Sequence, residues 1–272
     1  MNYGVIKVMQ HFVEVGLCRI SANVSALRPD APWLVFSNSL MTDHTIWAAQ
    51  QAHFAGRYNI LAYDQRGHGR SDAPAKVSFA DLSGDVLALL DHFDIASCIY
   101  VGLSMGVPTG LNFAAGNPGR VTAMILSDGQ MATQPSGRQT WQARIDLARA
   151  EGMAHVADDT VARWFDPAFI ASGGAETLRQ AAAEMQVDGY CACAAALQDY
   201  DFTTAAAGLT VPVQLLAGAN DGAMPTVMAA MAETIRGASL SVIEGAGHIP
   251  NVEKPEAFNR AMETFLTFIT KS

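Results

Sequence analysis

The sequence is poor in basic residues. Lysine and arginine together number 17 against 26 aspartates and glutamates, for a net charge of −9 at pH 7. Nucleic acids and anionic membranes are bound through clustered positive charge, so this balance opposes both as partners. We expect a small-molecule ligand, and an anionic ligand would need a local cationic contact against the overall field.

Long apolar runs are also absent. No stretch of about 18 apolar residues is free of charges and breaks, so we expect no membrane-spanning segment. Residues 1–10 hold one lysine and no apolar run of signal-peptide length. These absences favour a cytoplasmic protein.

The four cysteines form no metal-binding pattern. Cys18, Cys98, Cys191 and Cys193 lack the spacing of a zinc site, and the Cys191/Cys193 pair is too close for an ordinary structural disulfide. We expect reduced, mostly buried thiols and neither a metal nor an organic cofactor.

Apolar residues are plentiful: they make up 50% of the 272 residues, and 16% are charged, which suits one large domain. Short apolar runs that alternate with helical periodicity predict a mostly parallel, eight-stranded sheet flanked by helices. The expected strands are 11–16, 18–25, 33–37, 58–63, 98–101, 121–126, 211–216 and 240–243. The expected helices include 80–93, 107–115 and 255–269.

The middle of the chain has a different character. Residues 131–206 are rich in alanine, glutamine, arginine and aspartate, and contain no convincing strand. We expect this segment to be a helical cap inserted in a core formed by residues 1–130 and 207–272.

A nucleophile motif follows one of the expected strands. Gly102-Leu103-Ser104-Met105-Gly106 matches G-x-S-x-G and stands between a strand and a helix. In that context the glycines allow a tight turn that projects the serine hydroxyl above the sheet. Ser104 is therefore the predicted nucleophile.

A serine nucleophile needs a base, and the sequence has seven histidines. His248 lies in a loop between the last strand and the last helix and is the predicted base. His44 is a candidate for a ligand contact, and His68 stands in a turn that is usually structural. The other four are interpreted as surface or packing residues: His11, His53, His92 and His155.

The acid that orients the histidine should follow a strand between Ser104 and His248. Asp221, after the strand 211–216, is the preferred candidate. Asp128, after the strand 121–126, is the alternative, because some proteins with this motif carry the acid there.

Acyl transfer also needs hydrogen-bond donors for the oxyanion. The backbone N–H of Met105, next to the nucleophile, is the first expected donor. The second is the backbone N–H of Leu40, in the loop after the third strand. Asn38 and Ser39 in the same loop are expected to line the substrate site.

The sequence resembles the 3-oxoadipate enol-lactonases, a bacterial family with the α/β-hydrolase fold, from about residue 12 to its end. Ser37-Asn38-Ser39-Leu40, in place of a His-Gly pair, is specific to that group. The other similar segments are 63–69, 102–106, 141–145, 152–153, 163–169, 189–195 and 251–259. Departures from the family pattern occur at Met41, Val107, Pro108 and 127–140.

The resemblance implies hydrolysis of a small lactone that bears a carboxylate. Ser104 would attack the ring carbonyl, and water activated by His248 would release the acid. Within the expected cap, Trp141 and Arg144 are three residues apart on one helical face, so they could wall the ring and pair with the carboxylate. Alternatively, Trp141 packs the cap against the core and Arg144 pairs with a surface aspartate.

Other functions fit the same residues. The substrate could be a simple ester, a different lactone or a carbon–carbon bond next to a ketone. A cofactor-free oxygenase or perhydrolase could use the same scaffold, but nothing in the sequence favours it. The intact Ser, His and Asp set argues against a ligand-binding receptor without activity. A homo-oligomer is compatible with the sequence.

Overall fold

A computed structural model describes residues 9–271, and its centre is an eight-stranded sheet with the order β1-β2-β4-β3-β5-β6-β7-β8. β2 pairs antiparallel with β1 and β4, and all other pairs are parallel. The mostly parallel, eight-stranded sheet predicted from the sequence is confirmed. Its strands are β1 (Met9–Val15), β2 (Cys18–Ser25), β3 (Trp33–Ser37), β4 (Asn59–Tyr63), β5 (Cys98–Leu103), β6 (Val121–Ser127), β7 (Val213–Gly218) and β8 (Ser239–Ile243).

Two strands end two residues later than the sequence patterns predict. β7 begins at Val213, since Pro212 has no N–H to contribute to the ladder, and it continues to Gly218. β5 continues to Leu103, which pairs with Ser127 of β6. Both extensions carry the chain to the edge of the sheet where the candidate site lies.

Helices cover both faces of the sheet, because strand side chains alternate between the two faces. Val35 and Leu61 belong to one buried cluster, whereas their neighbours Leu34 and Ile60 belong to the other. The first face packs against α2 (Phe79–His92), α3 (Gly106–Gly116), α9 (Thr203–Ala207) and α10 (Met224–Thr234). The second packs against the 3-10 helix η1 (His44–Trp47) and against α1 (Ala48–Phe54), α11 (Pro250–Glu253) and α12 (Pro255–Ile269).

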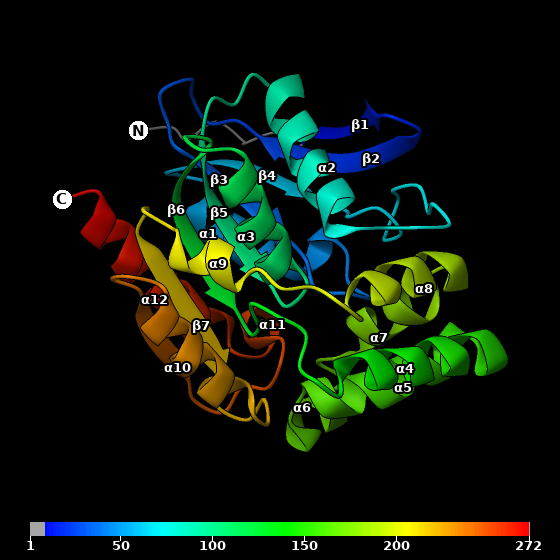
Figure 1. Cartoon of the computed structure of the whole chain (residues 1–272). Helices are drawn as coiled ribbons and strands as arrows, with labels where there is room; N and C mark the ends of the chain where they lie inside the picture. Colours follow the sequence, from blue (N-terminus) through cyan, green and yellow to red (C-terminus); the bar gives the residue numbers. More distant parts are fainter. Residues whose placement is uncertain (1–8, 272) are drawn as a thin grey trace.

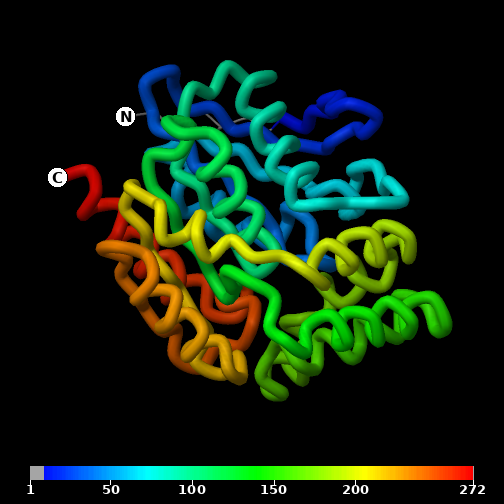
Figure 2. Tube along the Cα trace, viewed as in Figure 1, coloured from blue at the N-terminus to red at the C-terminus, as the bar shows by residue number. Residues whose placement is uncertain are grey.

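Between β6 and β7 the structure contains helices and one isolated β-bridge, between Ala132 and Asp201, but no strand. Five of the helices gather to one side of the sheet, as the green to yellow-green segments of Figures 1 and 2 show. They are α4 (Gly137–Glu151), α5 (Met153–Trp164), α6 (Pro167–Ala171), α7 (Glu176–Ala183) and α8 (Val187–Ala196). Apolar side chains of α4, α5, α7 and α8 share a buried cluster with Leu40, Met41 and Met105, so this helical layer lies over the loops that follow β3 and β5.

None of the helices in the described part of the chain is both long enough and apolar enough to cross a membrane. The four cysteines are free and buried.

Candidate active site

Ser104 occupies a strained turn between β5 and α3. Its φ is +54°, in the left-handed region that non-glycine residues rarely adopt. The flanking glycines allow the turn to close: a Cβ on Gly102 would lie 2.5 Å from the Gly106 oxygen, and one on Gly106 would lie 2.5 Å from the Ser37 oxygen. The Ser104 N–H donates to the Ser127 oxygen at 2.8 Å, which ties the turn to β6.

Two loops bring a histidine and an aspartate to this serine. His248, between β8 and α11, places Nε2 2.9 Å from the Ser104 Oγ. Its Nδ1 lies 2.7 Å from Oδ2 of Asp221, in the turn after β7. A proton on Nδ1 leaves Nε2 free to accept the serine proton, which is the arrangement that general-base catalysis requires.

His248 is held by the helical layer as well as by Asp221. Its backbone N–H donates to the Trp164 oxygen at 2.8 Å, and the indole of Trp164 stacks on the imidazole with centroids 5.8 Å apart. Burial alone would lower the pKa of His248, but the charge and hydrogen bond of Asp221, with a contribution from Asp128, raise it above its ordinary value.

Asp128, the alternative acid, lies at the end of β6 but makes no hydrogen bond to His248. Its carboxylate accepts from the Ser127 hydroxyl at 2.6 Å and from the Gly218 N–H at 2.8 Å. Burial raises the pKa of Asp128 to about 8. The geometry therefore gives Asp221, and not Asp128, the position of the orienting acid.

The two predicted oxyanion donors lie beside the serine. Leu40 and Met105 both line the cavity that contains Ser104, as does Ser39. The backbone N–H groups of Leu40 and Met105 donate to no acceptor within residues 9–271, so both remain available to a ligand.

Asn38 is not brought into the cavity. Its side chain is fully buried, where Nδ2 donates to the Tyr63 oxygen at 2.8 Å and Oδ1 accepts from the Trp47 indole at 2.8 Å. Both polar ends are therefore used inside the protein, and the side chain supports the loop from behind.

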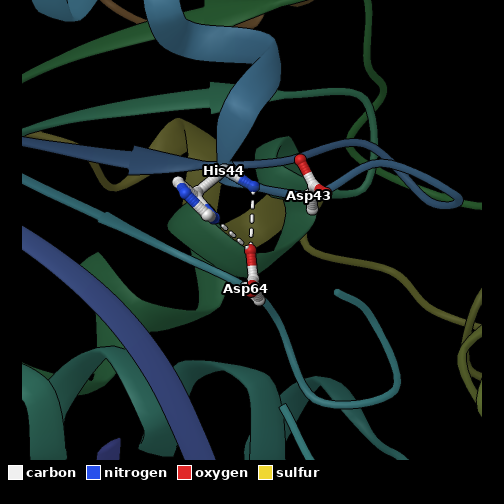
Figure 3. A group of neighbouring side chains, drawn as sticks. All are labelled: Asp43, His44 and Asp64. Atoms are coloured by element: carbon white, nitrogen blue, oxygen red, sulfur yellow. Dashed lines mark hydrogen bonds and ion pairs between the residues drawn. The ribbon is translucent and has the colours of Figure 1, made fainter. Parts of the chain in front are cut away.

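His44 also lies outside the cavity. Figure 3 shows its backbone N–H and its Nδ1 directed at one carboxylate oxygen of Asp64, at 2.9 Å and 2.6 Å. Its Nε2 contacts the Asn23 amide at 2.5 Å. Asp43, His44 and Asp64 offer possible ligand atoms within 4.8 Å of one another, but the imidazole is already bonded on both sides. The cluster is an anchor for the backbone.

The remaining histidines lie apart from Ser104. His68 is buried and bonded to the backbone, whereas His53 and His155 contact acidic side chains. His11 and His92 each pack against the ring of Phe93.

The cavity has a volume of about 410 Å³ and lies between the sheet edge and the helical layer. Trp141 and Arg144 of α4 both line it, with the guanidinium 4.6 Å from the centre of the indole. Arg163 of α5 is a third lining residue, bonded to the Thr160 hydroxyl at 2.9 Å. Burial and the nearby charge of Arg163 lower the pKa of Arg144. Neither arginine pairs with a carboxylate in the part of the chain that the structure describes.

Comparison with known proteins supports one family. The model of the alpha/beta hydrolase family matches residues 34–261. The chain belongs to the alpha/beta hydrolase family. It is 38% identical over 244 residues to 3-oxoadipate enol-lactonase 2 of Acinetobacter baylyi, and the match covers 87% of this chain and 89% of that protein. The resemblance predicted from the sequence is thereby confirmed.

Two further relatives bear on this alpha/beta hydrolase. The crystal structure of the enol-lactonase from Burkholderia xenovorans LB400 is 33% identical, with a TM-score of 0.89 over 94% of this chain and all of that one. A proposed carbamate hydrolase of Pseudomonas syringae is 28% identical, and the match covers 88% of this chain and 95% of that protein. Activity as a hydrolase is common to these names, whereas the substrates differ.

Sequence reasoning missed several residues of the alpha/beta hydrolase cavity. Gln130 and Gln134 line it from the divergent segment 127–140, and no periodicity marks them. Arg163 and Trp164 lie within a segment that resembles the enol-lactonases. Their places in the cavity depend on how α5 packs beside α4, which the sequence pattern does not define.

Proposed function

We propose that this hydrolase opens a small lactone that bears a carboxylate, with 3-oxoadipate enol-lactone as the substrate and 3-oxoadipate as the product. The observation that carries the proposal is the chain of hydrogen bonds from Ser104 through His248 to Asp221. This chain lies at a cavity lined by Arg144, which has no carboxylate partner among residues 9–271.

In the proposed reaction, His248 takes the proton of Ser104 as the hydroxyl attacks the ring carbonyl. The backbone N–H groups of Leu40 and Met105 stabilise the oxyanion. Collapse of the tetrahedral intermediate breaks the ring C–O bond, and the departing enolate oxygen takes the proton held by His248, so that the enol leaves and the imidazole is neutral again. Water then loses a proton to His248 and attacks the acyl-enzyme, which releases the acid and regenerates the serine.

Arg144 supports the choice of an anionic substrate. An arginine in a cavity loses hydration, and the neighbouring Arg163 adds like-charge repulsion, so an unoccupied site is electrostatically costly. A substrate carboxylate relieves both effects through a charge-assisted hydrogen bond. Trp141, in contact with the guanidinium, provides a flat apolar wall for the ring.

We assign residues 131–206 the role of a cap that closes over this cavity. The four free, buried cysteines are compatible with a reducing compartment, so we place the reaction in the cytoplasm.

A substrate panel tests the proposal: kcat/KM is measured on 3-oxoadipate enol-lactone, an uncharged lactone of the same ring size, p-nitrophenyl acetate and a simple carbamate. We expect the carboxylated enol-lactone to be preferred by at least about tenfold, the worth of one charge-assisted contact. A preference for the uncharged lactone, the ester or the carbamate would contradict the proposed substrate while leaving the hydrolase assignment intact.

A further inference from the structure

The loop after β3 that holds Leu40 is strained at the next residue. Met41 has a φ of +67°, in the left-handed region that is unfavourable for residues other than glycine and asparagine. Such a conformation persists only where the surroundings enforce it, and it often marks a functional position. Met41 also lines the cavity with Leu40 and Ser104.

One side chain holds the backbone of Met41. The Met41 N–H donates to Nε2 of His68 at 3.0 Å. Nδ1 of the same imidazole lies 3.1 Å from the Arg66 oxygen. Because Nε2 must accept, the proton sits on Nδ1 and is donated to Arg66. Both ring nitrogens are therefore bonded to the backbone, and His68 as a whole residue is 2% exposed.

The ring is suited to remain in this neutral form. Burial lowers the pKa of His68, and this outweighs the opposite effects of the Arg66 carbonyl and of the Asp64 and Asp43 carboxylates that face it. If Nε2 were also protonated, the imidazole could no longer accept from the Met41 N–H, because two donors would face each other.

Further anchors of this loop lie at its base, on the last residue of β4 and just after it. The Asn38 amide donates to the Tyr63 oxygen, and the Gln65 amide donates to the Asn38 oxygen, each at 2.8 Å. At the far end, His44 is bonded to Asp64 (Figure 3). Between these ends, the Thr42 hydroxyl donates to the Ser39 oxygen at 2.9 Å and the Ser39 hydroxyl donates to the Leu40 oxygen at 3.2 Å. His68 is the side chain that accepts from the Met41 N–H.

We propose that His68 is a positioning residue for catalysis: its neutral imidazole holds Met41 in the left-handed conformation and so fixes the peptide that carries the Leu40 N–H. The inference rests on the proposed function, in which that N–H stabilises the oxyanion. His68 touches no substrate atom and acts through the backbone.

Two substitutions at His68 separate this role from general support of the fold. The Gln side chain can place an oxygen near the position of Nε2 and accept from Met41, whereas the shorter Asn side chain reaches only the position of Nδ1. We expect His68→Asn to lower kcat for p-nitrophenyl acetate by about 10-fold to 100-fold with little change in KM. His68→Gln should retain most of the wild-type kcat.

A substitution at Met41 provides a second test. Glycine adopts a positive φ without a steric penalty, so in a Met41→Gly background the imidazole has less strain to counter. The loss caused by His68→Asn should then shrink to within about threefold. An equal loss in both backgrounds would show that His68 does not act through Met41.

Inhibitor binding gives an independent readout. A boronic acid that forms a tetrahedral adduct with Ser104 should bind His68→Asn about 10-fold to 100-fold more weakly, while the affinity for the acetate product stays unchanged. Equal kcat for the Asn and Gln variants, or a rise in KM alone, would overturn the proposal. If His68→Asn does not fold, His68→Gln decides: a kcat within about threefold of wild type supports the role, and a larger loss refutes it.

Wild type and Ser104→Ala are the reference proteins for these assays. Enol-lactone hydrolysis that is absent from wild type, or that survives Ser104→Ala, would be a failure of the proposed function. Ser104-dependent hydrolysis that is unaffected by His68→Asn would be a failure of the positioning role alone.

Discussion

A substitution of Asp221 tests whether its hydrogen bond to His248 orients the imidazole for catalysis. In the native protein the Asp221 carboxylate lies 2.7 Å from Nδ1 of His248. In Asp221→Asn the side-chain amide can donate a hydrogen bond to that nitrogen. The imidazole would then carry its proton on Nε2, 2.9 Å from Ser104 Oγ, and could no longer accept the serine proton. The variant also loses the negative charge that stabilises the imidazolium. We expect kcat to fall by about 10⁴-fold, equivalent to about 5 kcal/mol in the barrier.

Asp128→Asn is the matched control, because it is the same change at a second buried aspartate near His248. An amide can keep both native contacts of Asp128, to the Ser127 hydroxyl and the Gly218 N–H. Burial also raises the pKa of Asp128, which lessens the weight of its negative charge on His248. We expect kcat within about tenfold of wild type.

Both variants are assayed for kcat on p-nitrophenyl acetate and on the enol-lactone, with Tm measured to confirm folding. The reasoning is refuted if Asp128→Asn proves the more damaging change, in which case Asp128 is the orienting acid.

Three further predictions follow from the site. Arg144→Ala should raise KM for the carboxylated lactone by about 10-fold to 100-fold and leave a neutral ester unaffected; equal losses on both would make Arg144 structural. The pKa of His248 is raised above 6.5 because Asp221 outweighs the effect of burial, so kcat/KM should decline as pH falls through a midpoint above that value; a midpoint below 6.5 would contradict this. Gly218→Ala would place a Cβ 1.9 Å from the Gly247 oxygen and should lower stability by about 2–4 kcal/mol in a urea titration.

The sequence patterns predicted the sheet well because its inner strands β3 to β7 are buried, mostly apolar runs bounded by turns. β2, β3 and α12 have the predicted bounds. The G-x-S-x-G motif also has a local cause, the close approach of Gly102 and Gly106 to neighbouring backbone oxygens, and such causes are visible in sequence.

The cavity walls were harder to predict, because they depend on contacts between distant segments. Asn38 was expected to face the substrate, but its side chain bonds Tyr63 and Trp47. Trp164 approaches His248 through the packing of α5 on the loop after β8, 84 positions further along the chain, and sequence spacing gives no sign of it. Arg163 enters the cavity for the same reason.

Hydrolysis by Ser104→Ala is the most direct test of the central claim, that this hydroxyl is the nucleophile. Its Oγ bonds His248 and contributes little to the core, so the variant should keep the wild-type Tm. Turnover of the enol-lactone should fall by about 10⁴-fold to 10⁶-fold, as when a member of such a triad is removed. A folded variant that retains more than about a tenth of the wild-type rate would contradict the claim, since that loss is far below the range for a nucleophile.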